Sequence, residues 1–97
     1  MATFITLLNF TEQGIRGFKD TTKRADNFTK AAKKAGVTVK DVYWTSGSHD
    51  GVLILEADDD ASVSAALISL GTLGNVRTQT LRAYNRKEIE SILGKVS

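Results

Sequence analysis

Four segments of the chain are rich in β-branched, aromatic and aliphatic residues, which is typical of strands. Glycine, serine, asparagine and aspartate residues stand between them, and proline is absent from the whole chain. We therefore expect short turns and regular elements, with strands at residues 3–10, 37–46, 50–57 and 75–84.

The first helix is predicted by spacing. From Ile15 to Ala35 a series of residues, all apolar except Thr22, recurs at every third or fourth position, so they form one face of a helix. Thr11 can cap its start and Gly36 can end it. A straight helix of this length would extend beyond a neighbouring strand, so we expect a kink near Asp20.

Two further helices follow. Residues 60–72 predict a largely apolar helix that ends at Gly71 or Gly74. Asn85 and Glu88 have the spacing of a capping box, which predicts a short C-terminal helix.

The order is strand, helix, strand, strand, helix, strand and then a tail helix. It predicts an α+β fold of the ferredoxin-like βαββαβ type, with an antiparallel four-stranded sheet. In that plan the first and third strands are central and both main helices lie on one face. Residues 1–97 are expected to form a single domain.

Both central strands are apolar on both faces, although helices can cover only one face. Each large apolar side chain contributes roughly 1.5–3 kcal/mol on burial. Four of them together contribute about 6–12 kcal/mol, comparable with the whole stability of about 5–15 kcal/mol of a domain. We therefore expect a homodimer that packs sheet to sheet, or a larger homo-oligomer; the alternative is that the tail helix folds over this face. The side chains concerned are Ile5, Leu7, Val52 and Ile54.

Two motifs resemble the GYD domain family, and the similarity covers nearly the whole chain. The family is named for a Gly, a Tyr and an Asp in the turn; Gly47 and Asp50 match, but His49 stands where relatives usually have Tyr. The resemblance implies a small dimeric α/β barrel of bacteria or archaea and no common activity. The motifs are residues 43–47 with 49–50 and 52–56, and residues 70–71 with 74–83.

Composition excludes several kinds of chemistry. Cysteine is absent and there is one histidine, which excludes disulfides and thiolate catalysis and argues against a metal site. The aspartates at 58–60 are better explained as helix capping than as metal ligands. A net charge of +2 gives no strong field for nucleic acid. No segment resembles a signal peptide or a membrane span, so we expect a cytoplasmic protein with neither nucleic acid nor membrane as partner.

The turn after the second strand holds most of the candidate chemistry. It carries the only histidine, His49, next to Asp50, and the only tryptophan, Trp44, precedes it. A lone turn histidine is usually solvated, and we expect Asp50 chiefly to hold the turn through hydrogen bonds from the region of Ser46 or Ser48. The turn itself could be type I′ at residues 50–51 or type II′ at residues 47–48.

The fourth strand has mixed polarity on both faces. Arg77, together with Arg82 and Glu56, could recognise a carboxylate in a semi-polar cavity. The alternative is an edge strand whose charges lie in water or pair with Glu56 across a dimer.

Two functions are compatible with these patterns. The first is a homo-oligomeric binding or assembly module that holds a small metabolite between its sheets, with Trp44, His49, Asp50 and Arg77 as ligand-binding residues. The alternative is a small cofactor-free enzyme, monooxygenase-like or isomerase-like, by analogy of fold. The sequence offers no second base or nucleophile, so we assign no catalytic residue, cofactor or metal and regard the enzyme as the weaker interpretation.

Overall fold

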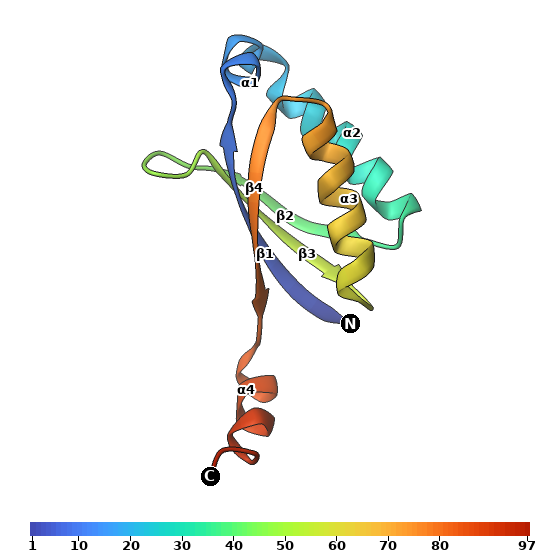
Figure 1. Ribbon diagram of the computed structural model, residues 1–97, viewed down its shortest axis with the longest axis vertical. Helices are drawn as coiled ribbons and strands as arrows, with labels where there is room; N and C mark the ends of the chain where they lie inside the picture. Colours follow the sequence, from blue (N-terminus) through green and yellow to red (C-terminus); the bar gives the residue numbers. More distant parts are fainter.

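The computed structural model describes all 97 residues, and its elements follow the predicted order (Figure 1). The strands and helices begin and end within a few residues of the expected positions. Their bounds are β1 Ala2–Phe10, α1 Glu12–Arg16, the 3₁₀ turn η1 Phe18–Asp20, α2 Thr21–Lys34, β2 Thr38–Trp44, β3 Gly51–Ala57, α3 Asp60–Thr72, β4 Val76–Ala83 and α4 Arg86–Leu93.

The four strands form one antiparallel sheet in the order β2-β3-β1-β4. The central strands are therefore β3 and β1, as predicted. Figure 1 shows α2 and α3 on the same side of this sheet. The ferredoxin-like α+β plan is confirmed.

The first helical segment is broken rather than gently kinked. The Thr11 hydroxyl accepts a hydrogen bond from the backbone N–H of Gly14 at 3.1 Å and so caps α1, as expected. After α1 the chain makes the 3₁₀ turn η1, which ends at Asp20, where the kink was predicted. Gly14 is needed for packing, because a Cβ there would overlap the carbonyl oxygen of Asn75.

The other predicted helix ends are confirmed. Asn85 and Glu88 form a reciprocal capping box at the start of α4. Asp59 caps α3, and Gly74, at a φ of +83°, follows its C-terminus in the left-handed conformation that favours glycine.

The connection between β2 and β3 differs from both turns considered above. Trp44 pairs with Gly51, so residues 45–50 form a loop outside the ladder, and β2 ends earlier than expected. Gly47 has a φ of +129° within this loop. Neither two-residue turn forms, because the backbone of Asp50 turns aside to donate a hydrogen bond to the carbonyl of Leu8 at 2.9 Å.

The hydrophobic core lies between the sheet and the two main helices. It contains 12 buried residues, among them Leu55 and Val37, which are fully buried. Thr6 is the buried polar member of this layer, and its hydroxyl is hydrogen-bonded to that of Thr80 at 2.9 Å. The side chains of β1 alternate between the two faces of the sheet, as predicted: Phe4 and Leu8 face the helices, and Ile5 and Leu7 face the other way.

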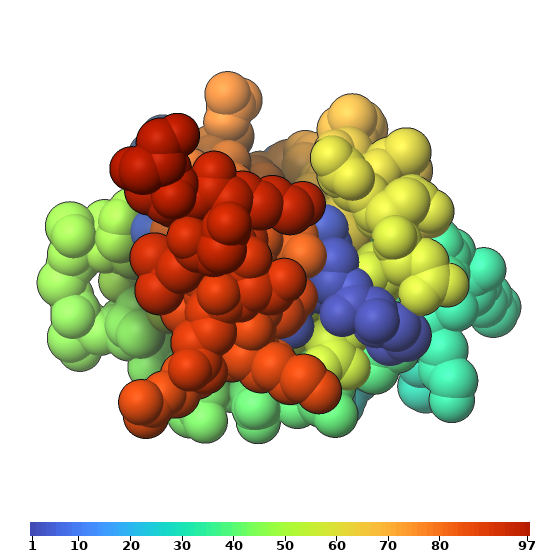
Figure 2. Space-filling model, turned by 90° about the horizontal axis from the view of Figure 1, so that it is seen from below, coloured from blue at the N-terminus to red at the C-terminus, as the bar shows by residue number.

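The other face of the sheet, which we call the open face, is covered by no element of the chain. Helix α4 extends away from the end of β4 (Figure 1), and it projects toward the viewer in Figure 2. It therefore does not fold over the open face, which was the alternative to a partner. The exposed surface of 6685 Å² exceeds the roughly 5400 Å² expected for a compact monomer of this mass. No helix is both long and apolar enough to cross a membrane.

Candidate functional site

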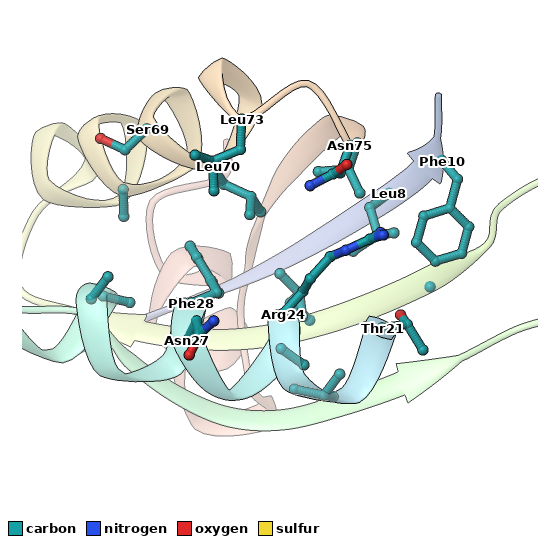
Figure 3. Close-up of a pocket in the computed structure, with 18 of the residues that line it drawn as sticks. Leu8, Phe10, Thr21, Arg24, Asn27, Phe28, Ser69, Leu70, Leu73 and Asn75 are labelled. Atoms are coloured by element: carbon teal, nitrogen blue, oxygen red, sulfur yellow. The ribbon is translucent and has the colours of Figure 1, made fainter. Parts of the chain in front are cut away.

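A cavity of about 590 Å³ lies between the sheet and the helices α2 and α3 (Figure 3). Its floor is formed by the helix-facing side chains of the sheet, among them Leu8, Val42 and Leu53. Phe28 of α2 and Leu70 of α3 form its walls. The lining is mostly apolar, and small-molecule sites in proteins commonly have this character and size.

The cavity exists because small residues stand where the two helices face each other. Ala31 and Ala32 of α2, with Ala35 directly after this helix, line one side, and Ala65 and Ala66 of α3 line the other. Protein interiors are normally packed to nearly constant density, so a row of alanines opposite a sheet leaves volume that larger side chains would fill.

Polar side chains also line the cavity, and Arg24 is the charged one among them. Figure 3 shows Arg24 reaching from α2 toward Leu8 and Asn75. Its guanidinium donates hydrogen bonds to the carbonyl of Gly14 at 3.1 Å and to that of Gly17. These bonds fix Arg24 to the segment that joins α1 to η1, where the Gly17 carbonyl also accepts a hydrogen bond from the backbone N–H of Asp20 at 3.0 Å.

Trp44 is the one predicted ligand-binding residue that lines this cavity. Its indole N–H donates a hydrogen bond to the hydroxyl of Thr21, at the start of α2, over 2.9 Å. The ring therefore connects the end of β2 to α2 beside the cavity, and it remains 44% exposed.

His49 and Asp50 lie in loop 45–50 and serve to attach it to β1. The His49 ring nitrogen Nδ1 lies 3.0 Å from the side-chain oxygen of Asn9, and Asn9 donates to the carbonyl of Ser48 at 2.8 Å. The partner of the imidazole is thus Asn9, not the neighbouring Asp50.

The Asp50 carboxylate accepts a hydrogen bond from the backbone N–H of Phe10 at 2.8 Å. The expected donors, Ser46 and Ser48, do not bond to it. A structural role for Asp50 is correct, but its partner is a strand 40 residues earlier, because the loop folds back against the end of β1.

The predicted group of Arg77, Arg82 and Glu56 does not form within one chain. Arg77 pairs in the ladder with Asn9 and faces the open side. Arg82 is on the helix side, where it contacts Glu88 at 3.5 Å, while Glu56 lies 4.0 Å from Lys40. Because successive side chains of β4 point to opposite faces of the sheet, Arg77 and Arg82 lie on different faces.

Two carboxyl groups have a lowered pKa, and both are at helix starts. The backbone N–H of Ser62 lowers the pKa of Asp59, and that of Asn85, with a smaller contribution from Arg82, lowers the pKa of Glu88. Neither lines the cavity under α2 and α3. No group of His, Asp or Glu side chains is arranged to hold a metal ion.

Sequence reasoning missed the cavity and Arg24. The available signal was the alternation of alanines with larger residues on both helices, with one arginine four positions before Phe28 on the same face. These small residues leave a cavity only once the two helices are packed against the sheet, and this packing cannot be read from the spacing.

Known proteins resemble this chain along most of its length. The family model for the GYD domain matches residues 4–93. The "glutamine synthetase and cystathionine beta-lyase binding protein" of Thermus thermophilus is 33% identical over 84 residues, which is 86% of this chain and 88% of that protein.

Two solved structures are similar in fold. TTHA0845 from Thermus thermophilus has a TM-score of 0.50 at 25% identity, covering 89% of this chain and 100% of that one. MtbAldR has a TM-score of 0.61 at 15% identity, covering 88% of this chain and 52% of that one, and this likeness concerns the fold alone.

Proposed function

The chain belongs to the GYD domain family, and we propose that it is a cytoplasmic homo-oligomeric module that binds other proteins. In this proposal two copies pack open face to open face. The observation that carries it is the apolar open face of the sheet, which no part of the chain covers. The name of the Thermus thermophilus relative, a binding protein for two enzymes, supports the binding role.

The open face has a continuous apolar centre across three adjacent strands. Ile5 of β1 lies directly between Ile54 of β3 and Leu81 of β4. In the next row Leu7 lies beside Val52. An interface of ordinary size buries about 800 Å² on each partner, which is within the reach of one sheet face.

The charges at the two ends of this patch favour a second copy as the occupant. Glu56 lies beside Thr3 at one end, and Arg77 lies beside Asn9 at the other. A two-fold axis running across the strands would bring Glu56 of each copy toward the partner's Arg77. The same surface would thus be complementary to itself, as a symmetric dimer requires.

A small metabolite between the two sheets has weaker support than the dimer itself. Both hollows of the structure are on the helix side of the sheet, one behind β1–β3 and a shallower one between α3 and β4. The enzyme alternative gains no support either, since His49 and Arg77 do not line the cavity under α2 and α3, and no basic or acidic side chain other than Arg24 lines it.

The test uses the substitution Ile54→Glu, which places a charge in the centre of the open face. We expect it to abolish the oligomer, because a buried carboxylate without a partner costs several kcal/mol. The matched control is Thr22→Glu on the exposed side of α2.

Binding is measured by surface plasmon resonance against purified glutamine synthetase and purified cystathionine beta-lyase from the same organism. We expect saturable binding of at least one enzyme by the wild type and by Thr22→Glu. Absence of binding to both would contradict the protein-binding role, while an Ile54→Glu protein with unchanged mass would contradict the dimer.

Charge reversal tests the orientation of the two copies. Arg77→Glu and Glu56→Arg should each weaken the dimer, and the double variant should regain most of the loss, because it restores opposite charges across the axis. The expected effect is about 0.2–1 kcal/mol per pair and decreases with added salt. Sedimentation equilibrium at low and high salt measures it; additive losses in the double variant would contradict this orientation.

A further inference from the structure

We propose that the cavity between the sheet and the helices binds a small amphipathic carboxylic acid. The apolar body of the ligand lies among the alanines and leucines, and its carboxylate binds the guanidinium of Arg24. The site lies behind the sheet, on the side opposite the proposed dimer interface, so it does not depend on the proposed function.

The cavity suits an apolar ligand body. Its volume of about 590 Å³ falls within the range of small-molecule sites, roughly 300–1000 Å³. Of its 23 lining residues 16 are hydrophobic, among them Leu53, Phe28 and Ala66. A polar ligand body would lose its hydrogen bonds to water there without replacement.

Arg24 supplies a positive charge that has no acidic partner in the chain. The ion pairs of the structure involve other basic residues, namely Arg16, Lys40, Arg82 and Arg86. Arg24 is half-buried and bonds only to two backbone carbonyls, through its two terminal nitrogens. A guanidinium has five N–H donors, so three remain for a ligand.

One unpaired guanidinium among neutral groups favours a monoanion. The other polar side chains that line the cavity are all uncharged; they are those of Thr21, Asn27, Tyr43, Trp44, Ser69, Thr72 and Asn75. Arginine binds carboxylates through paired hydrogen bonds. A phosphate dianion would keep one charge uncompensated beside an apolar wall, which is costly.

The chain carries its own reporter of occupancy, because its only tryptophan, Trp44, lines the cavity. Decanoate, 2-naphthoate and the neutral 1-decanol serve as probes, followed by Trp44 fluorescence and by calorimetry. We expect decanoate or 2-naphthoate to bind about tenfold or more tightly than the alcohol, in line with one charge-assisted hydrogen-bonded pair. The two acids distinguish an aliphatic from an aromatic ligand body.

Two pairs of variants locate the site. Arg24→Met should remove the preference for the acid and leave the affinity for 1-decanol within about threefold, whereas Arg24→Lys should keep part of the preference. Ala65→Leu, which fills part of the cavity, should weaken all three probes, while Ala61→Leu on the same helix but outside the cavity should weaken none. Circular dichroism of each variant establishes that it is folded.

Equal affinity of the wild type for decanoate and 1-decanol would overturn the role of Arg24. Failure of all three probes to change Trp44 emission, with no heat of binding, would overturn the site. Light scattering of the same samples separates either failure from a failure of the dimer, which concerns the other face of the sheet.

Discussion

The two faces of the sheet differ in what covers them, although the same strands supply both. On the helix side, Leu55 and Leu53 are buried under α2 and α3. On the open side, Ile54 and Val52 of the same strand have no cover from the chain. An apolar face without cover in an antiparallel sheet indicates an interface, whereas incomplete packing under the helices indicates a cavity.

The largest effects are expected from alanine substitutions at two adjacent residues of β3, Leu55 and Ile54, which face opposite sides of the sheet. Leu55→Ala should lower the free energy of unfolding by about 2–5 kcal/mol at any protein concentration, since Leu55 is fully buried within one chain. Ile54→Ala should instead destabilise in a concentration-dependent way, because its cover comes from a second copy. Denaturant unfolding at two concentrations tenfold apart measures both; a concentration-independent loss for Ile54→Ala would contradict the comparison.

Gly14→Ala tests how tightly the helix side is built around the cavity. The added Cβ would overlap the carbonyl oxygen of Asn75, so α1 must shift, at an expected cost of about 1–3 kcal/mol. Gly71→Ala is the matched control, because a Cβ in that position on α3 would meet nothing within 4 Å beyond its own stretch of helix. Thermal unfolding should show a lower midpoint for the first and an equal or higher midpoint for the second. Equal midpoints for the two variants would be inconsistent with this packing.

Asp50→Ala tests the attachment of loop 45–50 to β1. The substitution leaves the backbone N–H of Phe10 without its acceptor, and we expect a loss of about 1–2 kcal/mol. Ser48→Ala, which removes only a hydroxyl that makes no hydrogen bond, should leave stability unchanged. Amide hydrogen exchange at Phe10 should become faster in the first variant alone; unchanged exchange would argue against the bond.

The smallest effect concerns the cap of α3 on the helix side. The pKa of Asp59 is lowered by the N–H of Ser62, so its charge stabilises the fold above the unfolded-state value of 3.8. That contribution is lost as the pH falls through the lower folded value. Asp59→Asn can still cap the helix, so the difference from wild type should be present at pH 7 and shrink below pH ~4. A difference in stability between the wild type and Asp59→Asn that did not change with pH would rule out a charge effect.

Local patterns predicted the architecture well, because each depends on neighbours in sequence. The capping box of Asn85 and Glu88, the break near Asp20 and the two apolar faces of β1 and β3 all follow from spacing. The resemblance to the GYD domain family was also correct.

The site was predicted poorly, because it depends on contacts between distant segments. The acceptor of Phe10 is 40 residues away, and Asn9, not Asp50, is the partner of His49. Arg24 belongs to a helix whose many lysines are typical of a solvated face, and only the turn at η1 brings it against α1 and the end of the cavity. Spacing shows which face a residue occupies, but it does not show how far that face lies from the next layer.

The most direct measurement is the mass of the wild-type protein in solution by multi-angle light scattering at low micromolar concentration. The chain has a mass of 10.5 kDa. Packing of the open face against a second copy predicts twice that mass or a higher even multiple, and a return to the single-chain mass in Ile54→Glu. A wild-type protein that remains at the mass of one chain would contradict the assignment of the open face as an interface between copies.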